Sequence, residues 1–178
     1  MKKPVYRCEG SWSMELPNSK MWTLTHMISR KIITASVSGS LFAVLLGLIN
    51  PFGGTITSFK HYLLTFVLAT PVYLMYSFPF IIVYGVLASI ISDKLSRWIS
   101  AKLGAEKFEI MISAVLHLVF GLILRWYSLG ASLLFFITDR LLKKNNREYK
   151  LKQAMKSLAI PFAVWLIFIG MVWIEHIL

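Results

Sequence analysis

Long stretches without charged residues dominate the pattern of the chain. No Asp, Glu, Lys or Arg occurs in residues 32–59, 61–92, 110–124, 126–138 and 157–174. A helix needs about 20 mostly apolar residues to cross the hydrocarbon layer of a bilayer, and three of these stretches reach or approach that length. None of them carries the polar face that a helix on the surface of a soluble protein requires. The pattern therefore predicts an all-α, polytopic helical membrane protein.

The boundaries between apolar and polar segments predict two parts. Residues 1–31 are polar and basic, with Pro4, Gly10, Pro17 and Asn18 as helix breakers, and we expect a loose cytoplasmic arm. Residues 32–178 form the transmembrane helical domain. Its expected spans cover about 32–49, 61–92, 108–124, 126–142 and 158–175. The second span contains Pro71 and Pro79, which predict a long, tilted and kinked helix.

Small residues recur every four positions along the first span, at Ala35, Gly39, Ala43 and Gly47. This spacing places them on one face of a helix, where a neighbouring helix can approach closely. We interpret this face as a helix-packing surface, used either within the chain or in dimerisation.

The number of spans depends on Arg125, which interrupts an otherwise uncharged stretch from Ile110 to Thr138. One crossing would give four spans and leave an arginine inside the bilayer, at a cost of at least about 2.5 kcal/mol. Two crossings, or a re-entrant hairpin, would place Arg125 at a turn beside Trp126 and Tyr127. These aromatic residues favour the interface between membrane and water.

The distribution of Lys and Arg favours the turn. With five spans, seventeen of the 19 basic residues lie on the cytoplasmic side, and only Lys60 and Arg125 lie outside. With four spans the division is ten against eight plus the buried Arg125. Because cytoplasmic loops are rich in Lys and Arg, we expect five spans. The N-terminus is then cytoplasmic and the C-terminus extracytoplasmic.

Two similar segments support this topology. "IISDKLSR" at 90–97 resembles "FITDRLLK" at 136–143, which aligns Asp93 with Asp139. In each segment the acid precedes a base by four residues, on one helix face. If both segments leave the membrane into the cytoplasm, their helices run in the same direction, as five spans require.

The segments "SLGASLLFFITDRLL" and "KSLAIPFAVWLIFIGMVWIE" resemble a family of small, uncharacterised multi-pass membrane proteins of Gram-positive bacteria. The resemblance covers residues from about Met27 to the end. It implies an integral protein of the bacterial cytoplasmic membrane, and it implies no particular activity.

One polar helix face forms the candidate functional site. Ser113, His117, Gly121 and Arg125 are spaced by four residues on the third span, and such a face should turn away from lipid. Its ordinary role is internal hydrogen bonding, and a proton or cation relay through His117 is the functional alternative. A metal or haem site is not expected, because no second histidine lies at ligand spacing.

Other features narrow the class of function. No catalytic motif is present, and one cysteine, Cys8, permits no intrachain disulfide. We expect neither enzymatic activity nor a cofactor. The net charge is +11, and the basic residues that produce it flank the apolar stretches. This placement indicates contact with anionic lipid head groups and not with nucleic acid. Asp93, Asp139 and Glu175 lie at span boundaries, and the lack of a deep carboxylate argues against a proton-driven transporter.

Three classes of function remain, and an intramembrane enzyme is the least favoured of them. The other two act without catalysis. The first is a small accessory, immunity or scaffold protein that acts through helix–helix contacts with a membrane-protein partner. The second is a subunit of an oligomeric channel or transporter, because five short spans scarcely enclose a pathway without a homo-oligomer.

Overall fold

A computed structural model describes residues 17–52, 58–104, 109–123, 126–145 and 149–177, and these residues are almost entirely helical. The chain is therefore all-α, as predicted. The first sixteen residues of the expected arm, and Arg125 at the expected turn, lie outside the described residues.

The first helix, α1 (Pro17–Ile49), begins well before the expected span. Proline suits the first turn of a helix because its missing N–H needs no partner there. The helix ends before Pro51, which cannot continue it. The prediction of a loose arm up to residue 31 is therefore wrong from Pro17 onward, because residues 17–31 belong to α1 and the polar side chains of Ser29 and Lys31 are buried.

The second span is one long helical rod. It comprises α2 (Phe59–Phe80), a π-helical turn η1 (Ile81–Gly85) and α3 (Val86–Leu103). The π turn follows Pro79, which lacks the N–H needed for the preceding hydrogen bond. The helix continues past residue 92, the expected end. It stops at Gly104, whose φ of 61° is the left-handed conformation that glycine adopts at helix ends.

The stretch around Arg125 forms two helices, α4 (Glu109–Ile123) and α5 (Trp126–Lys144). They run antiparallel, because Gly121 packs on Ser132 while His117 packs on Phe135. One continuous helix over residues 110–138, the basis of the four-span alternative, is therefore wrong.

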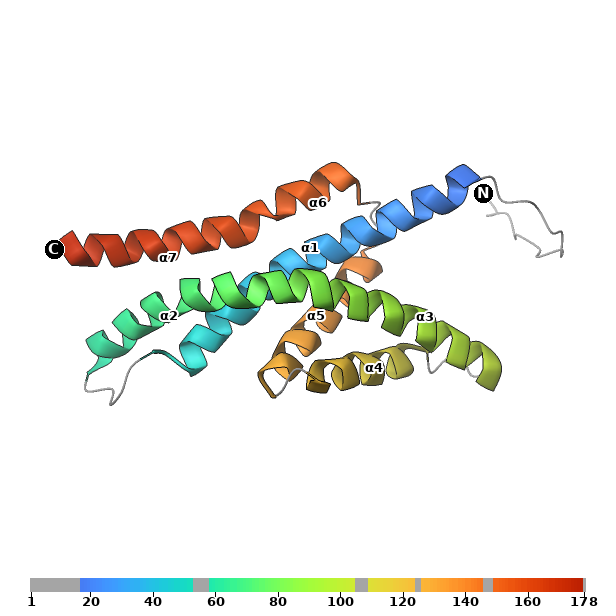
Figure 1. The fold of residues 1–178 in the computed structure, drawn as a ribbon, viewed down its shortest axis with the longest axis horizontal. Coiled ribbons are helices and arrows are strands. Elements are labelled where there is room, and N and C mark those ends of the chain that lie inside the picture. The colour runs from blue at the N-terminus through green and yellow to red at the C-terminus, as the bar shows by residue number, and fades with distance from the viewer. Residues whose placement is uncertain (1–16, 53–57, 105–108, 124–125, 146–148, 178) are drawn as a thin grey trace, which may run out of the picture.

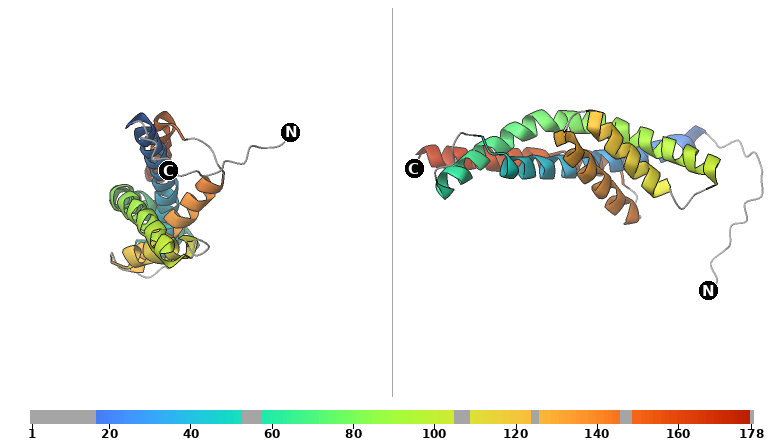
Figure 2. Two further views of the ribbon diagram at one scale, coloured as in Figure 1. Left: turned by 90° about the vertical axis from the view of Figure 1, so that its right-hand side faces the viewer. Right: turned by 90° about the horizontal axis from the view of Figure 1, so that it is seen from below.

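The chain ends in α6 (Leu151–Ser157) and α7 (Ala159–Ile177). These helices run beside α1 and α2, as a hydrogen bond between Ser157 and Ser36 (3.3 Å) and an edge-to-face contact between Phe168 and Phe66 show. Figures 1 and 2 show an elongated bundle in which α6 and α7 cover one side and the α4–α5 hairpin lies on another.

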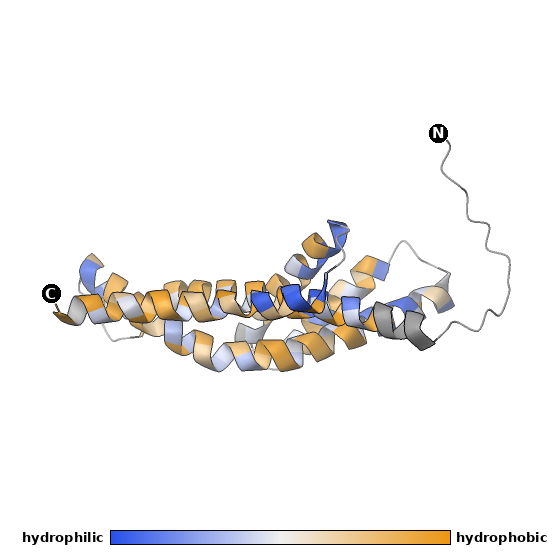
Figure 3. Ribbon diagram, turned by 90° about the horizontal axis from the view of Figure 1, so that it is seen from above, coloured by the Kyte–Doolittle hydropathy of each residue, from blue (hydrophilic) through white to orange (hydrophobic). Residues whose placement is uncertain are grey.

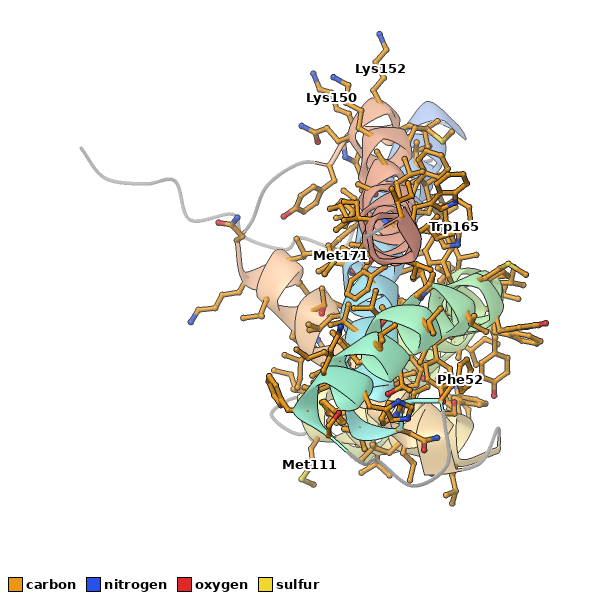
Figure 4. All side chains as sticks on the ribbon, turned by 90° about the vertical axis from the view of Figure 1, so that its left-hand side faces the viewer. Phe52, Met111, Lys150, Lys152, Trp165 and Met171 are labelled. Atoms are coloured by element: carbon orange, nitrogen blue, oxygen red, sulfur yellow. The ribbon has the colours of Figure 1, made fainter. Side chains whose placement is uncertain are left out.

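Within the part of the chain that the structure describes, three helical segments are long and apolar enough to cross a membrane: Leu24–Ile49, Phe59–Lys102 and Leu151–Ile174. The segment Glu109–Leu122 is apolar but shorter. Figure 3 shows apolar residues along most of the length of the helices, and many large apolar side chains are exposed. Lys150 and Lys152, at the start of α6, point away from the bundle (Figure 4). These features are compatible with a membrane location.

The small-residue face of α1 packs within the chain. Ala35 and Ala43 are fully buried, Gly39 faces Phe78 and Gly47 faces Thr70. A Cβ atom added at Gly47 would lie 2.5 Å from Thr70 Oγ1 and 3.4 Å from its main-chain Cα. Close approach of α1 and α2 therefore depends on this glycine.

We expect Gly47→Leu to lower stability by about 1–3 kcal/mol or more, because a leucine forces the two helices apart. The matched control is Gly170→Leu in α7, where an added Cβ meets no atom within 4 Å. Thermal unfolding of both variants in mild detergent checks the prediction. Equal melting temperatures for the two leucine variants would contradict it.

Candidate functional site

A buried lysine lies where α1, α3 and α5 meet. The Lys31 side chain is fully buried, and its Nζ donates hydrogen bonds to Asp93 Oδ2 at 2.6 Å and Asp139 Oδ2 at 2.8 Å. It also donates to Ser89 Oγ. These three acceptors compensate the loss of hydration, because an ammonium group in an apolar interior is costly unless it is paired and hydrogen-bonded.

Two arginines complete the charged cluster, which we define as Arg30, Lys31, Asp93, Asp139 and Arg140. Arg30 Nε donates to Asp139 Oδ1 at 3.1 Å, and Arg140 lies 3.8 Å from Asp93 Oδ1. Both arginine side chains are 19% exposed, whereas that of Asp139 is 4% exposed. The cluster thus has a closed centre at Lys31 and a partly open rim. Its three basic groups outnumber its two acids.

Small polar residues let the helices approach the cluster closely. Ser89, Ser92 and Ser96 of α3 are fully buried, as is Ser113 of α4. Ser113 Oγ donates to Asp93 Oδ1 at 3.3 Å, which ties α4 to the charged cluster. The result is a polar seam between α3 and α4 that reaches the centre of the bundle.

His117 continues this seam one helical turn further. Its Nδ1 lies 3.2 Å from the main-chain oxygen of Ser113. A carbonyl oxygen only accepts, so Nδ1 carries the proton in this hydrogen bond and Nε2 of the neutral ring is an acceptor. The Nε2 atom is buried and has no hydrogen-bond partner among the described residues. The ring packs against Phe135 and Phe136.

A cavity of about 70 Å³ adjoins His117. Residues from α2, η1, α3, α4 and α5 line it: Phe80, Ile81, Tyr84, Gly85, Ala88, His117, Phe120, Gly121, Ser128, Ala131, Ser132 and Phe135. The π turn contributes Gly85, whose added Cβ would lie 3.3 Å from the Phe135 ring. The absence of a side chain there lets α5 approach η1.

The structure brings together three residues of the predicted polar face. Ser113 bonds to Asp93, His117 lines the cavity, and Gly121 packs against Ser132. Arg125, the fourth, lies outside the described residues. The small-residue face from Ala35 to Gly47 lies elsewhere in the bundle and forms the contact of α1 with α2 and η1.

The charged cluster itself was not anticipated from the sequence. Asp93 and Asp139 were expected to pair with bases four residues later at span boundaries. Instead both carboxylates bind Lys31, and Arg97 donates to the main-chain oxygen of Asp93. Asp139 is only 3% exposed as a residue, so a carboxylate at an expected span boundary is buried inside the bundle. The similarity of segments 90–97 and 136–143 was the sequence feature that could have indicated a shared environment for Asp93 and Asp139.

Among the described residues, no group of three or more His, Cys, Asp and Glu side chains is arranged to hold a metal ion. No protein-family model, curated protein or solved structure matches the chain. The arrangement at Lys31 is suited to holding helices together through charge, and His117, with its unpartnered Nε2 atom, lines the cavity.

We expect Lys31→Met to destabilise the protein by about 3–5 kcal/mol, because it leaves two carboxylates near the interior without their shared cation. Methionine retains the unbranched chain of lysine, which limits the loss of packing. Lys94→Met is the matched control, since Lys94 is exposed on α3. Thermal unfolding in mild detergent compares the two variants. A Lys31→Met protein as stable as the Lys94→Met protein would show that the cluster is not a stabilising element.

Proposed function

We propose that the protein is a small accessory, immunity or scaffold protein of the bacterial cytoplasmic membrane, which acts through helix–helix contacts. The helical segments that are long and apolar enough to cross a membrane support this location. The observation that carries the proposal is the internal compensation of the charged cluster. Lys31 is bound by two carboxylates and a serine hydroxyl of its own chain. These contacts hold the helices of the bundle together.

We further propose five membrane passes. Successive passes α1, α2–α3, α4, α5 and α6–α7 run in alternating directions, because each pass contacts its neighbours at two points. These contacts are Lys31–Asp93 and Gly47–Thr70, Tyr84–Phe120 and Asp93–Ser113, His117–Phe135 and Gly121–Ser132, and, for α6–α7, Ser157–Ser36 and Phe168–Phe66. As helices, α4 spans about 22 Å and α5 about 28 Å. Both fall short of a hydrocarbon core of about 30 Å, so local thinning or side-chain snorkelling accompanies this hairpin. A re-entrant hairpin is the alternative.

The orientation follows from the ends of α3 and α5. Asp93 and Asp139 meet at Lys31, so both helices approach the same side of the membrane. The basic connectors that follow them then share that side with the N-terminal segment. This side is cytoplasmic by the distribution of Lys and Arg, where the basic residues contact anionic lipid head groups. The C-terminus is extracytoplasmic.

The outer face of α7 offers the surface for a partner helix. The segment Leu151–Ile174 is the least buried of the three long apolar segments. Large apolar side chains project from it, including Ile167, Met171 and Trp173. In the membrane such a surface contacts either lipid or another helix, and packing between helices depends on shape and not on hydrophobicity.

A subunit of an oligomeric channel or transporter is the second candidate. The specific observation in its favour is the burial of Asp139 beside Lys31, next to a helix that carries the unpartnered Nε2 atom of His117. Buried ionisable groups in membrane helices commonly mark ion or proton pathways.

Purification of the full chain in mild detergent, with mass measurement of the intact complex, separates the two functions. The accessory role predicts a stoichiometric complex with an unrelated membrane protein and no ion flux after reconstitution of the purified chain alone. A symmetric homo-oligomer that conducts ions or protons, with flux abolished by Asp139→Asn, would favour the channel and contradict the accessory role.

Labelling of single cysteines in a Cys8→Ser background tests the five passes. We expect Phe52→Cys and a cysteine at position 127 to react with a membrane-impermeant thiol reagent in intact cells, because both positions face the exterior. A cysteine at position 145 should react only after permeabilisation, since it follows the basic end of α5. Protection of position 127 in intact cells, with labelling of position 52, would instead indicate a re-entrant hairpin that does not reach the outer surface.

A further inference from the structure

Polar side chains that carry hydrogen-bond acceptors line the cavity beside His117. Three of the four polar side chains that line it donate their protons to main-chain oxygens, and the fourth is Ser128. Tyr84 donates to Phe120 at 2.9 Å and Ser132 donates to Leu129 at 3.0 Å. His117 donates through Nδ1 to Ser113 at 3.2 Å. Each group retains a lone pair, so the cavity is complementary to a molecule that donates a hydrogen bond.

His117 is the strongest of these acceptors. The residue is 4% exposed, and its Nε2 atom has no hydrogen-bond partner among the described residues. Buried polar atoms are almost always hydrogen-bonded in native proteins, so each exception calls for an explanation. A ligand hydroxyl in the cavity that His117 lines supplies the missing donor.

A groove on the outside of the bundle adjoins this cavity. Its volume is about 400 Å³, and it lies between α1, α2, η1 and α5. The groove and the cavity share Phe80, Ile81, Ser128 and Ala131 in their walls. The remainder of the groove is mainly apolar and includes Phe42 and Leu46. Phe80 is 65% exposed, so the groove opens on a face that meets acyl chains in a bilayer.

The charge of the surroundings disfavours an ammonium ligand. Ser113 joins His117 to the charged cluster, because its hydroxyl binds Asp93 while its main-chain oxygen binds His117. That cluster has three basic groups and two acids, which leaves an excess of positive charge. A cation would also lose its hydration in a cavity walled mainly by aromatic and aliphatic side chains. A neutral ligand that donates a hydrogen bond is not repelled by the positive charge, and it does not lose the hydration of an ion.

We propose that the cavity and groove bind a neutral, membrane-soluble alcohol or phenol with a single apolar chain. Its hydroxyl donates a hydrogen bond to His117 Nε2, and its chain lies along Phe42, Leu46 and Phe80. The proposal rests on the membrane location proposed above, which makes such molecules available from the lipid side. It assigns a ligand to a site that neither proposed function requires.

Competitive photolabelling of the full chain in phosphatidylcholine nanodiscs tests the site. The probe is a long-chain alcohol that carries a diazirine, and the competitors are octylphenol and its methyl ether. The ether matches the phenol in shape but lacks the donor. We expect labels on peptides from residues 73–88 and 128–135. We also expect octylphenol to compete about three- to tenfold better than the ether, as one net hydrogen bond predicts.

The variant His117→Phe retains a ring but removes the acceptor, and should abolish the preference for phenol over ether. Ser157→Ala, in a buried position away from the cavity, should retain it. Equal competition by phenol and ether in the wild-type protein would overturn the proposal, as would labelling confined to α7. Because the comparison of the two competitors uses the wild-type chain, it decides the question even if His117→Phe does not fold. The topology labelling and mass measurement test the proposed function separately.

Discussion

The burial of one ammonium group constrains the positions of four helices. Lys31 on α1 can remain charged in the interior only while carboxylates from α3 and α5 contact it, because the desolvation of an isolated ion costs several kcal/mol or more. Asp93 and Asp139 provide these contacts at 2.6 and 2.8 Å. Ser113 then ties α4 to Asp93. A sliding movement of α1, α3 or α5 by one turn would separate a charge from its partner, so the cluster sets the register of the bundle.

The rest of the bundle adapts to this register through small side chains and one local change in helix geometry. On α1, glycine and alanine bring α2 into contact on the side of Gly47 and Thr70. The π turn after Pro79 interrupts the regular repeat of the long rod just before Ser89 and Asp93. Gly85 in that turn leaves room for the Phe135 ring. The cavity beside His117 lies at this junction, where close packing gives way to a groove.

Much of the fold could be predicted from sequence because bilayer thickness and turn chemistry act locally. The apolar stretches, the helix break at Gly104 and the interruption between residues 110 and 138 all follow from such local rules. The charged cluster could not be predicted in the same way. Lys31 lies at the edge of an apolar stretch, where a lysine that snorkels to the interface and a lysine that pairs internally give the same pattern. The partners of Lys31 are 62 and 108 residues away. Only the similarity of the segments around Asp93 and Asp139 hinted at a shared environment.

A double-mutant cycle on Lys31 and Asp139 tests most directly whether this ion pair organises the bundle. The unfolding free energies of the wild type, Lys31→Met, Asp139→Asn and the double variant are measured in one detergent. The account predicts a coupling energy of about 1–3 kcal/mol, so that the double variant loses less stability than the two single losses combined. Additive losses, within about 0.5 kcal/mol, would mean that the two side chains act independently. That result would contradict a bundle whose register depends on their contact.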